Sequence, residues 1–216
     1  MEVEVFADVL CPWSYIGKRR LERAMAGFGP AERERLTIRW RSYELSPDAS
    51  RVPGLSAATS MTRWWGEEGT ARVDQIHALA RAEGLAIDLH LAHPVNTFDA
   101  HRVVHLGGVH GRADQVMERM LRGYLCEGLN ISTPEVLQRL GVESGLDADA
   151  VRGVLAGDAH ADAVRSDEQR AKDKGVTGVP MLVIEDGSPV AGIQPPADLR
   201  RLLADALSAT AVPTID

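Results

Sequence analysis

The order of local patterns near the N-terminus constrains the fold more than any other feature of this chain. Residues 2–7 and 36–43 alternate between apolar and polar side chains, which is typical of β-strands. Between these segments, apolar residues recur at helical spacing from residue 12 until the Gly29–Pro30 pair, which predicts the end of a helix. The sequence therefore predicts a βαβ unit, and Cys11 occupies its first strand-to-helix turn.

The pattern changes after the second predicted strand. From about residue 56 to residue 174, helical segments follow one another without a strand signal, and Thr133–Pro134 and Asp147 mark helix starts. Strand signals return in residues 181–185, Asp186–Gly187 predicts a hairpin turn, and an amphipathic helix follows. The sequence thus indicates a helical bundle inserted into an α/β unit.

Composition and charge limit the function classes. Hydrophobic residues make up 44% of the 216 residues and charged residues 25%, so we expect an ordinary globular chain without a membrane span. The net charge of −7 comes from 31 acidic and 24 basic residues without a basic run, which argues against nucleic-acid binding. The N-terminal segment has acidic residues where a signal peptide carries positive charge, and two cysteines fit a reducing compartment, so we expect a cytoplasmic protein.

The segment DVLCPWSYIG contains the residues in which we expect the chemistry. The first turn of a helix lowers a thiol pKa below its free value of about 8.5, so Cys11 is expected to react as a thiolate. Pro12 favours the first helical position, Trp13 can shield the sulfur, and the Ser14 hydroxyl can donate a hydrogen bond to the thiolate. We expect no metal site, because no pair of cysteines and no HExxH motif accompanies the histidines.

Each cysteine also has a structural interpretation. Free cysteine is among the most buried residue types, so Cys11 is alternatively a small core residue. Cys126 lies near a predicted helix end, where the helix dipole does not favour a thiolate, and we expect it to serve packing. A disulfide between Cys11 and Cys126 stays open, because pairing depends on distances that a sequence does not contain.

A second motif, GVTGVP, precedes the late strand. A proline that opens a strand cannot donate a hydrogen bond to the sheet, and a cis bond before Pro180 leaves the Val179 backbone free to pair with an extended ligand. Taken alone, Pro180 is better interpreted as an ordinary trans proline at a strand start. The other motifs of the chain change this interpretation.

Four segments in order along the chain resemble the DsbA family within the thioredoxin-like fold. They are DVLCPWSYIGK near the N-terminus, NTFDAHR in the helical region, GVTGVP, and GIQPP. More narrowly, the chain looks like the FrnE-like cytoplasmic branch, in which CPWC stands where this chain has CPWS. The resemblance covers essentially the whole chain.

The resemblance implies an α/β fold of the thioredoxin-like type with an inserted all-helical domain, and thiol–disulfide oxidoreductase activity. It also implies that Pro180 is a cis-proline that faces the thiol across a substrate groove, with Pro12, Trp13 and Val179 beside it. The implied division of the chain is residues 1–45 for the first part of the thioredoxin-like domain, residues 46–170 for the helical insertion, and residues 171–216 for the second part.

Ser14 departs from the family pattern at the position of the second thiol. A single thiolate at Cys11 can still attack a disulfide, but release of the mixed disulfide then needs an external thiol such as glutathione. We therefore expect no bound cofactor, glutathione as a candidate co-substrate, and a disulfide or a small thiol compound as the substrate. A homodimer is expected only by analogy with related glutathione enzymes.

The NTFDAHR segment has two interpretations. Its first residues can cap a helix and its apolar residues can form a buried helix face, which would be a structural role. Asn96, His101 and Arg102 can instead line a polar pocket, in which Arg102 suits a carboxylate of glutathione or of an acidic substrate. The sequence favours neither interpretation.

Two other functions compete with the oxidoreductase. Kappa-class transferases and 2-hydroxychromene-2-carboxylate isomerases resemble this architecture and have serine in the active turn, so a glutathione-dependent transferase or isomerase is the first alternative. Ser14 fits that group, whereas Cys11 stands where those enzymes typically have serine. The second alternative is a noncatalytic scaffold that binds its ligand beside Pro180 and has an unreactive Cys11 with a high pKa.

Overall fold

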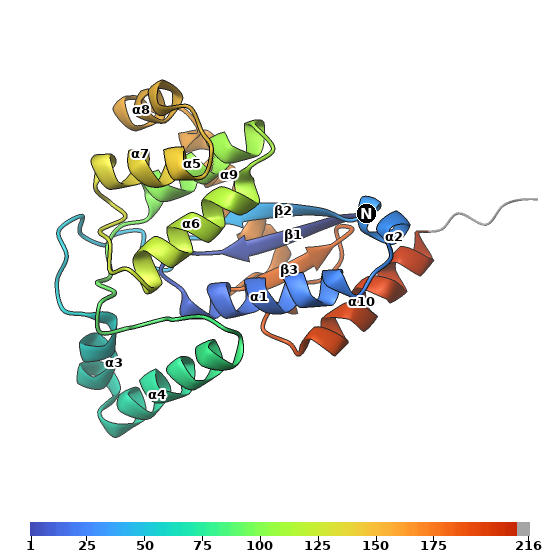
Figure 1. The fold of residues 1–216 in the computed structure, drawn as a ribbon, viewed down its shortest axis with the longest axis horizontal. Helices are drawn as coiled ribbons and strands as arrows, with labels where there is room; N and C mark the ends of the chain where they lie inside the picture. The colour runs from blue at the N-terminus through green and yellow to red at the C-terminus, as the bar shows by residue number, and fades with distance from the viewer. Residues whose placement is uncertain (211–216) are drawn as a thin grey trace, which may run out of the picture.

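The computed structural model describes residues 1–210, which form a four-stranded sheet with helices packed around it (Figure 1). β1 lies inside the sheet, paired in parallel with β2 and antiparallel with β3, and β3 pairs antiparallel with β4. The βαβ unit and the later ββα unit predicted from the sequence are both present. In the order β2-β1-β3-β4 across the sheet, the strands are β2 (Thr37–Ser42), β1 (Glu2–Ala7), β3 (Met181–Ile184) and β4 (Val190–Ala191).

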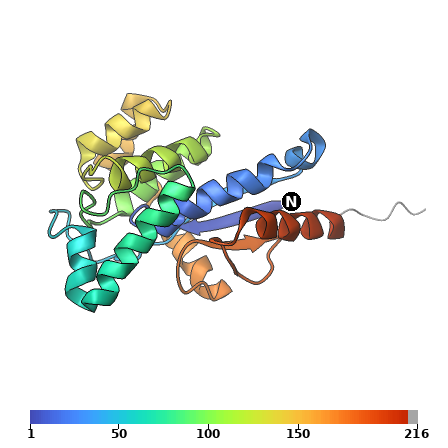
Figure 2. The same ribbon diagram turned by 60° about the horizontal axis from the view of Figure 1, so that its bottom comes forward.

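Ten helices accompany the sheet within the described residues. Those of the α/β part are α1 (Pro12–Ala26), α2 (Pro30–Glu34) and α10 (Pro196–Ala209). Those between β2 and β3 are α3 (Ala57–Trp65), α4 (Glu67–Ala82), α5 (Phe98–Val109), α6 (Ala113–Leu125), α7 (Pro134–Glu143), α8 (Ala148–Ala156) and α9 (Ala161–Lys174). The hairpin of α3 and α4, teal in Figures 1 and 2, lies at one end of the molecule. From residue 1 to residue 210, no helix is both long and apolar enough to cross a membrane.

Local sequence explains several helix boundaries. Asp147 caps α8, because its side chain accepts hydrogen bonds from the N–H groups of Asp149 and Ala150 at 3.0 and 2.9 Å. Pro134 starts α7, where the missing N–H group of proline costs nothing. Both of these predicted helix starts are confirmed.

The helical insertion has no separate core. Val3 and Val5 of β1 share one hydrophobic core with insertion residues such as Met120 and Leu140. Phe6 points to the other face of the sheet, where it packs with residues of α9 and β3 in a small second core. Helix α9 also continues past the predicted domain boundary at residue 170. Sheet and insertion therefore bury apolar surface against each other, which fixes the insertion beside the turn that carries Cys11.

The hairpin turn between β3 and β4 lies one residue earlier than predicted. Glu185 and Asp186 have positive φ angles of 48° and 64°, and the Gly187 N–H group donates to the Ile184 carbonyl oxygen at 2.9 Å. The central pair of the turn is thus Glu185–Asp186 and not Asp186–Gly187. Pairing of β3 with β1 extends to Ile184 and sets where the strand ends.

Candidate active site

Cys11 lies where the chain passes from β1 into α1. It immediately precedes Pro12, the first helical residue, and its N–H group donates to the Asp8 carbonyl oxygen at 3.1 Å. The sequence produces this geometry because Pro12 has the backbone angle of a first helical residue and lacks only a donor that the helix start does not use. Cys11 is only 4% exposed, and Pro12 is also buried.

The Val179–Pro180 segment faces Cys11 from the second part of the α/β domain. The peptide bond between Val179 and Pro180 is cis. The Cys11 thiol donates a hydrogen bond to the Val179 carbonyl oxygen, with an Sγ–O distance of 3.5 Å. Trp13 is half-buried beside this site and packs against the hydrophobic core. The fold therefore brings together two motifs that are 168 positions apart in the sequence.

Ser14 lies in the same turn as Cys11 and is 1% exposed. Its N–H group donates to the Cys11 carbonyl oxygen at 3.0 Å, and its Oγ accepts a weak hydrogen bond from the Asp8 N–H group at 3.4 Å. Hydrogen bonds from the Ser14 N–H and hydroxyl groups lower the pKa of Cys11, as the sequence predicts for Ser14. Ser14 thus occupies the position of a second thiol without its chemistry.

The predicted low pKa of the Cys11 thiol is wrong for this structure. Burial raises the pKa of Cys11 to about 11, the hydrogen bonds from Ser14 and Trp13 lower it by less, and the charge of Asp8 raises it further. Burial disfavours the charged thiolate more strongly than the start of the helix favours it. The surroundings of Cys11 therefore favour its neutral thiol form at neutral pH.

Cys126 lies at the end of α6, where the sequence places it, and is half-buried. Both cysteines are free thiols, so they form no disulfide with each other. Burial raises the pKa of Cys126 to about 11 as well. Its side chain packs against the hydrophobic core, which is the structural role expected from the sequence.

Asp8 is a residue of the site that the sequence analysis does not identify. It follows β1, is fully buried, and accepts hydrogen bonds from the N–H groups of Leu10 and Leu45 at 3.3 and 2.7 Å. Its Oδ1 atom lies 3.3 Å from His101 Nε2. Its position in the sequence could have identified it. Asp8 lies between an apolar strand and the cysteine turn, where a side chain is expected to be buried and where burial of a charged carboxylate is unfavourable.

Asn96 and His101 lie behind the active turn. The Asn96 side chain donates to the Pro47 carbonyl oxygen at 2.8 Å and accepts from the Phe98 N–H group at 3.1 Å, so it fixes the start of α5. His101 is 0% exposed and contacts Asp8. The fold thus brings His101 to Cys11 only through Asp8, and Asn96 supports the loop that precedes this helix.

Arg102 is part of the scaffold and not of the polar pocket that the sequence also allows. Its guanidinium group donates to the carbonyl oxygens of Ala159 and Gly157 at 2.9 and 2.6 Å, and to that of Val154. It also forms an ion pair with Asp99 at 2.8 Å. The N–H groups of Arg102 that would bind a substrate carboxylate are therefore already engaged within the protein. The Arg102 side chain is also buried.

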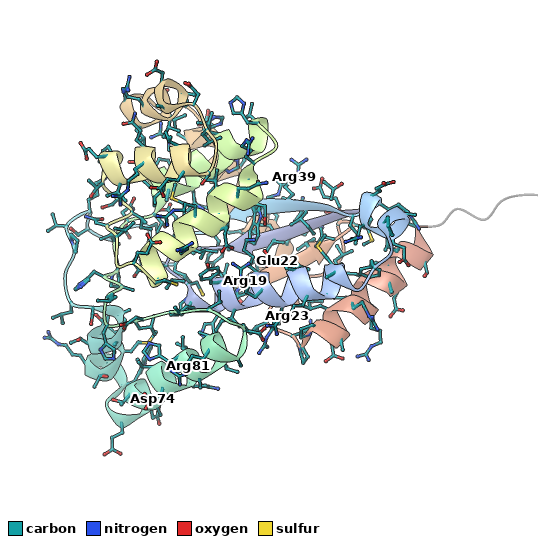
Figure 3. The ribbon with its side chains drawn as sticks, viewed as in Figure 1. Arg19, Glu22, Arg23, Arg39, Asp74 and Arg81 are labelled. Carbon is teal, nitrogen blue, oxygen red and sulfur yellow. The ribbon has the colours of Figure 1, made fainter. Side chains whose placement is uncertain are left out.

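Charged side chains hold α1 against the insertion. Lys18 is buried and lies 3.0 and 3.3 Å from carboxylate oxygens of Asp114 and Glu118 in α6. Figure 3 shows Arg19 and Glu22 on the side of α1 that faces α6, where Arg19 forms an ion pair with Glu118. The helix that begins directly after Cys11 and contains Ser14 is therefore fixed by the insertion as well as by the sheet.

A cavity of about 710 Å³ lies between β2 and the insertion, away from the cysteine. Its lining includes Arg39, which Figure 3 labels, together with Trp40, His105 and Asp167. None of the nine predicted site residues lines this cavity. Among the residues that the structure describes, no group of three or more His, Cys, Asp or Glu side chains is arranged to hold a metal ion.

Gly17 allows α1 to approach the Val179–Pro180 segment closely. A Cβ atom at this position would lie 2.8 Å from Pro180 Cγ and 3.0 Å from the Gly192 carbonyl oxygen. We expect Gly17→Ala to lower the free energy of unfolding by about 1–3 kcal/mol, because overpacking outweighs the better helix propensity of alanine. Chemical denaturation measures this loss.

Gly178→Ala is the matched control, because a Cβ atom at Gly178 meets no atom within 4 Å. Its free energy of unfolding should stay close to that of the unaltered protein. Equal stability of the two variants would show that α1 and the Pro180 segment can separate without cost.

Fold and site together define a class of protein: a thioredoxin-like domain with an inserted helical region, and with a helix-start cysteine that faces a cis-proline. Residues 2–204 match the DSBA-like thioredoxin domain, and the chain belongs to this family. The predicted DsbA family and thioredoxin-like fold are therefore confirmed. The narrower FrnE-like assignment stays a prediction.

Solved structures give the same picture. The chain is 37% identical to a probable DsbA oxidoreductase, SCO1869 from Streptomyces coelicolor, with a TM-score of 0.88 over 96% of this chain and 90% of that one. The fold is also similar to a 2-hydroxychromene-2-carboxylate isomerase, at 17% identity and a TM-score of 0.66 over 97% of this chain and 95% of that one. The cytosolic disulfide reductase DsbM from Pseudomonas aeruginosa has 18% identity and a TM-score of 0.66, over 97% of this chain and all of that one. The neighbours thus include both oxidoreductases and an isomerase.

Proposed function

We propose that this protein is a thiol–disulfide oxidoreductase that acts through one cysteine, Cys11, and depends on an external thiol for product release. The observation that carries the proposal is the position of the Cys11 Sγ atom, at the start of α1 and 3.5 Å from the carbonyl oxygen of Val179 in the cis-proline segment. Family membership and the 37% identity to a probable DsbA oxidoreductase support the same class.

The reaction has two exchange steps. In the first, the Cys11 thiolate attacks a disulfide: one bond forms between Sγ and a substrate sulfur, the substrate disulfide bond breaks, and the other sulfur leaves as a thiolate that takes up a proton. In the second, an external thiolate attacks the substrate sulfur of the mixed disulfide: a new disulfide bond forms between these two sulfurs, the bond to Sγ breaks, and Cys11 leaves as a thiolate. Ser14 cannot make this second attack, because a hydroxyl group does not form disulfides. We propose glutathione as the external thiol of this step. We also propose that the protein is located in the cytoplasm.

Burial determines how the first step depends on pH. With the pKa of Cys11 raised to about 11, only about one thiol in a thousand is a thiolate at pH 8. The Val179 carbonyl oxygen, which accepts the thiol hydrogen bond, stabilises the protonated form. An extended substrate that pairs with the Val179 backbone would remove this contact and bring Cys11 closer to ionisation.

Reaction with oxidised glutathione tests the proposal. We expect one glutathione on Cys11, at a rate that rises about tenfold per pH unit between pH 8 and pH 10, because the thiolate fraction rises in that proportion below the pKa. Intact and peptide mass spectra measure the adduct. Cys11→Ala should form none, and Cys126→Ala is the matched control that should keep it.

Two outcomes would contradict the proposal. One is a glutathione adduct found only on Cys126. The other is an unmodified Cys11 at pH 10 under conditions in which iodoacetamide labels it.

A glutathione-dependent isomerase or transferase is the second candidate. The observation that favours it is the neutral, buried Cys11 thiol, which suits a site where bound glutathione supplies the reacting sulfur. The fold similarity to a 2-hydroxychromene-2-carboxylate isomerase agrees with this candidate. Isomerisation or conjugation of an aromatic substrate that survives Cys11→Ser would favour it. Ligand binding without any reaction would instead favour a noncatalytic scaffold.

A further inference from the structure

The cavity of about 710 Å³ runs along β2, which is an edge strand of the sheet. Residues 37–41 of β2 line it without interruption, and the rest of the lining comes from α5, α6, α9 and the turn between α5 and α6. Figure 1 shows α6 and α9 next to this strand. The volume lies within the range of about 300–1,000 Å³ that is usual for binding pockets. The cavity is therefore a groove between a sheet edge and helices.

Alternate residues of β2 direct their backbone groups into this groove. The Thr37 N–H group donates to the Met1 carbonyl oxygen at 2.9 Å, and the parallel pairing of β2 with β1 continues without a bulge to Ser42. Backbone groups in a strand point to its two neighbours in alternation. Thr37 thus faces β1, and the backbone groups of Ile38, Trp40 and Ser42 point outward.

Two of these three outward residues have backbone groups without a partner. The Ser42 N–H group donates to Asp167 Oδ2 at 2.9 Å, which closes that end of the edge. Within residues 1–210, the backbone groups of Ile38 and Trp40 form no hydrogen bond outside the sheet. Trp40 is only 6% exposed, and buried backbone groups in proteins are nearly always paired. An extended chain in the groove supplies the partners that these groups lack.

Arg39 is the least engaged charged residue of the groove. Two other charged lining residues, Arg41 and Asp167, pair with each other at 2.9 Å, and Asp114 pairs with a buried lysine of α1 at 3.0 Å. The Arg39 side chain is 53% exposed, and its one ion pair within residues 1–210 is with Glu2 at 3.2 Å. Exposed ion pairs of this kind contribute little free energy. Arg39, labelled in Figure 3, is therefore available to an acidic side chain in the groove.

We infer that this groove binds an extended, acidic peptide segment of another protein, which joins the sheet beside β2 as a fifth strand. The peptide runs antiparallel to β2, because antiparallel pairs are slightly more stable. Its acidic residue lies opposite Arg39, and the two residues that flank it exchange main-chain hydrogen bonds with Ile38 and Trp40. The inference does not rest on the proposed function, because Cys11 is not part of the groove.

A second copy of this chain fits the edge less well than an acidic peptide. Antiparallel pairing of two β2 strands centred on Arg39 places the two Arg39 side chains directly opposite each other. Pairing centred on Trp40 places Arg39 opposite Arg41. Like charges in such positions are unfavourable, so the charge of the edge favours an acidic strand from a different protein.

The test is the binding of the labelled peptide fluorescein-Thr-Val-Glu-Val-Thr-amide, measured by fluorescence anisotropy. N-methylation of either valine should weaken binding about tenfold, because it removes a hydrogen bond to β2. N-methylation of the glutamate is the matched control and should weaken binding much less, since its N–H group points away from β2. Replacing the glutamate by lysine should weaken binding about fivefold. Hydrogen exchange at the Ile38 and Trp40 N–H groups should slow when the peptide binds.

Variants of the protein test the charge. Arg39→Glu should reverse the preference, so that the lysine peptide binds more tightly than the glutamate peptide. Arg33→Glu makes the same change at an exposed residue of α2 outside the groove and should keep the original preference. Cys11→Ala should bind the glutamate peptide with unchanged affinity, whatever the outcome of the glutathione experiment.

Three outcomes would overturn the inference. The first is the absence of saturable peptide binding. The second is equal weakening by N-methylation at valine and at glutamate. The third is slow exchange in the wrong place or for the wrong reason: protection at Val179 and not at Trp40, or protection at Trp40 that grows with protein concentration without peptide, which would assign the edge to a second copy.

Discussion

Replacing Ser14 by cysteine should convert the single-thiol reaction into an internal two-thiol cycle. Ser14 lies in the same helical turn as Cys11, and its hydroxyl group is close enough to hydrogen-bond the thiol. A thiol at this position attacks the mixed disulfide within the molecule, where its effective concentration far exceeds that of any external thiol. We expect release from the mixed disulfide to be at least about a hundredfold faster. The glutathione adduct of Cys11 should not accumulate.

Mass spectrometry and a reduction assay check this result. After oxidised glutathione, the Ser14→Cys protein should have lost two hydrogens and carry no glutathione, whereas Ser14→Ala, the matched control, should keep the adduct on Cys11. A stable adduct in Ser14→Cys would contradict the prediction. It would mean that the side chain at residue 14 does not reach the Cys11 sulfur.

Arg102→Met should lower the free energy of unfolding by about 3–5 kcal/mol, because it leaves a buried carboxylate and three carbonyl oxygens, one of them buried, without their shared donor. The carboxylate is that of Asp99, and the carbonyl oxygens belong to Val154, Gly157 and Ala159. These contacts connect α5 with α8 and with the segment between α8 and α9. Denaturation with urea measures the loss.

Arg152→Met is the control for the arginine prediction. Arg152 forms one ion pair with Asp149, and both side chains are largely exposed, so its replacement should change the free energy of unfolding by no more than about 0.5 kcal/mol. A stable Arg102→Met protein with weakened binding of glutathione would contradict the scaffold role. That result would assign Arg102 to a substrate pocket instead.

Local patterns in the sequence predict most of the secondary structure because they report short-range effects. The alternation in residues 2–7 reflects a strand with two buried faces, and Pro12 and Asp147 start helices through their own backbone and side-chain chemistry. Helix α3 is not predicted as a separate element, because its large apolar residues Trp64 and Trp65 are exposed and form no buried stripe. A helix that buries few apolar side chains does not produce the apolar periodicity from which helices are predicted.

The site is predicted less completely than the fold. Cys11 and Ser14 are recognisable in the sequence, and Pro180 enters through the resemblance of four motifs to one family. Asp8 is missed, because its burial and its contacts with Leu45 and His101 join segments 37 and 93 positions apart. Arg102 has two interpretations in the sequence, and only its contacts with the segment between α8 and α9 distinguish them.

The sequence by itself determines the order of strands and helices, the reactive residue type at the start of α1, and the absence of a second thiol in that turn. Tertiary structure alone decides how acidic Cys11 is. Ionisation depends on the water that the fold removes, on the Val179 carbonyl oxygen that faces the thiol, and on the charge of the buried Asp8. These groups come from distant segments, and electrostatic energies depend on distance and burial in space and not on separation along the chain.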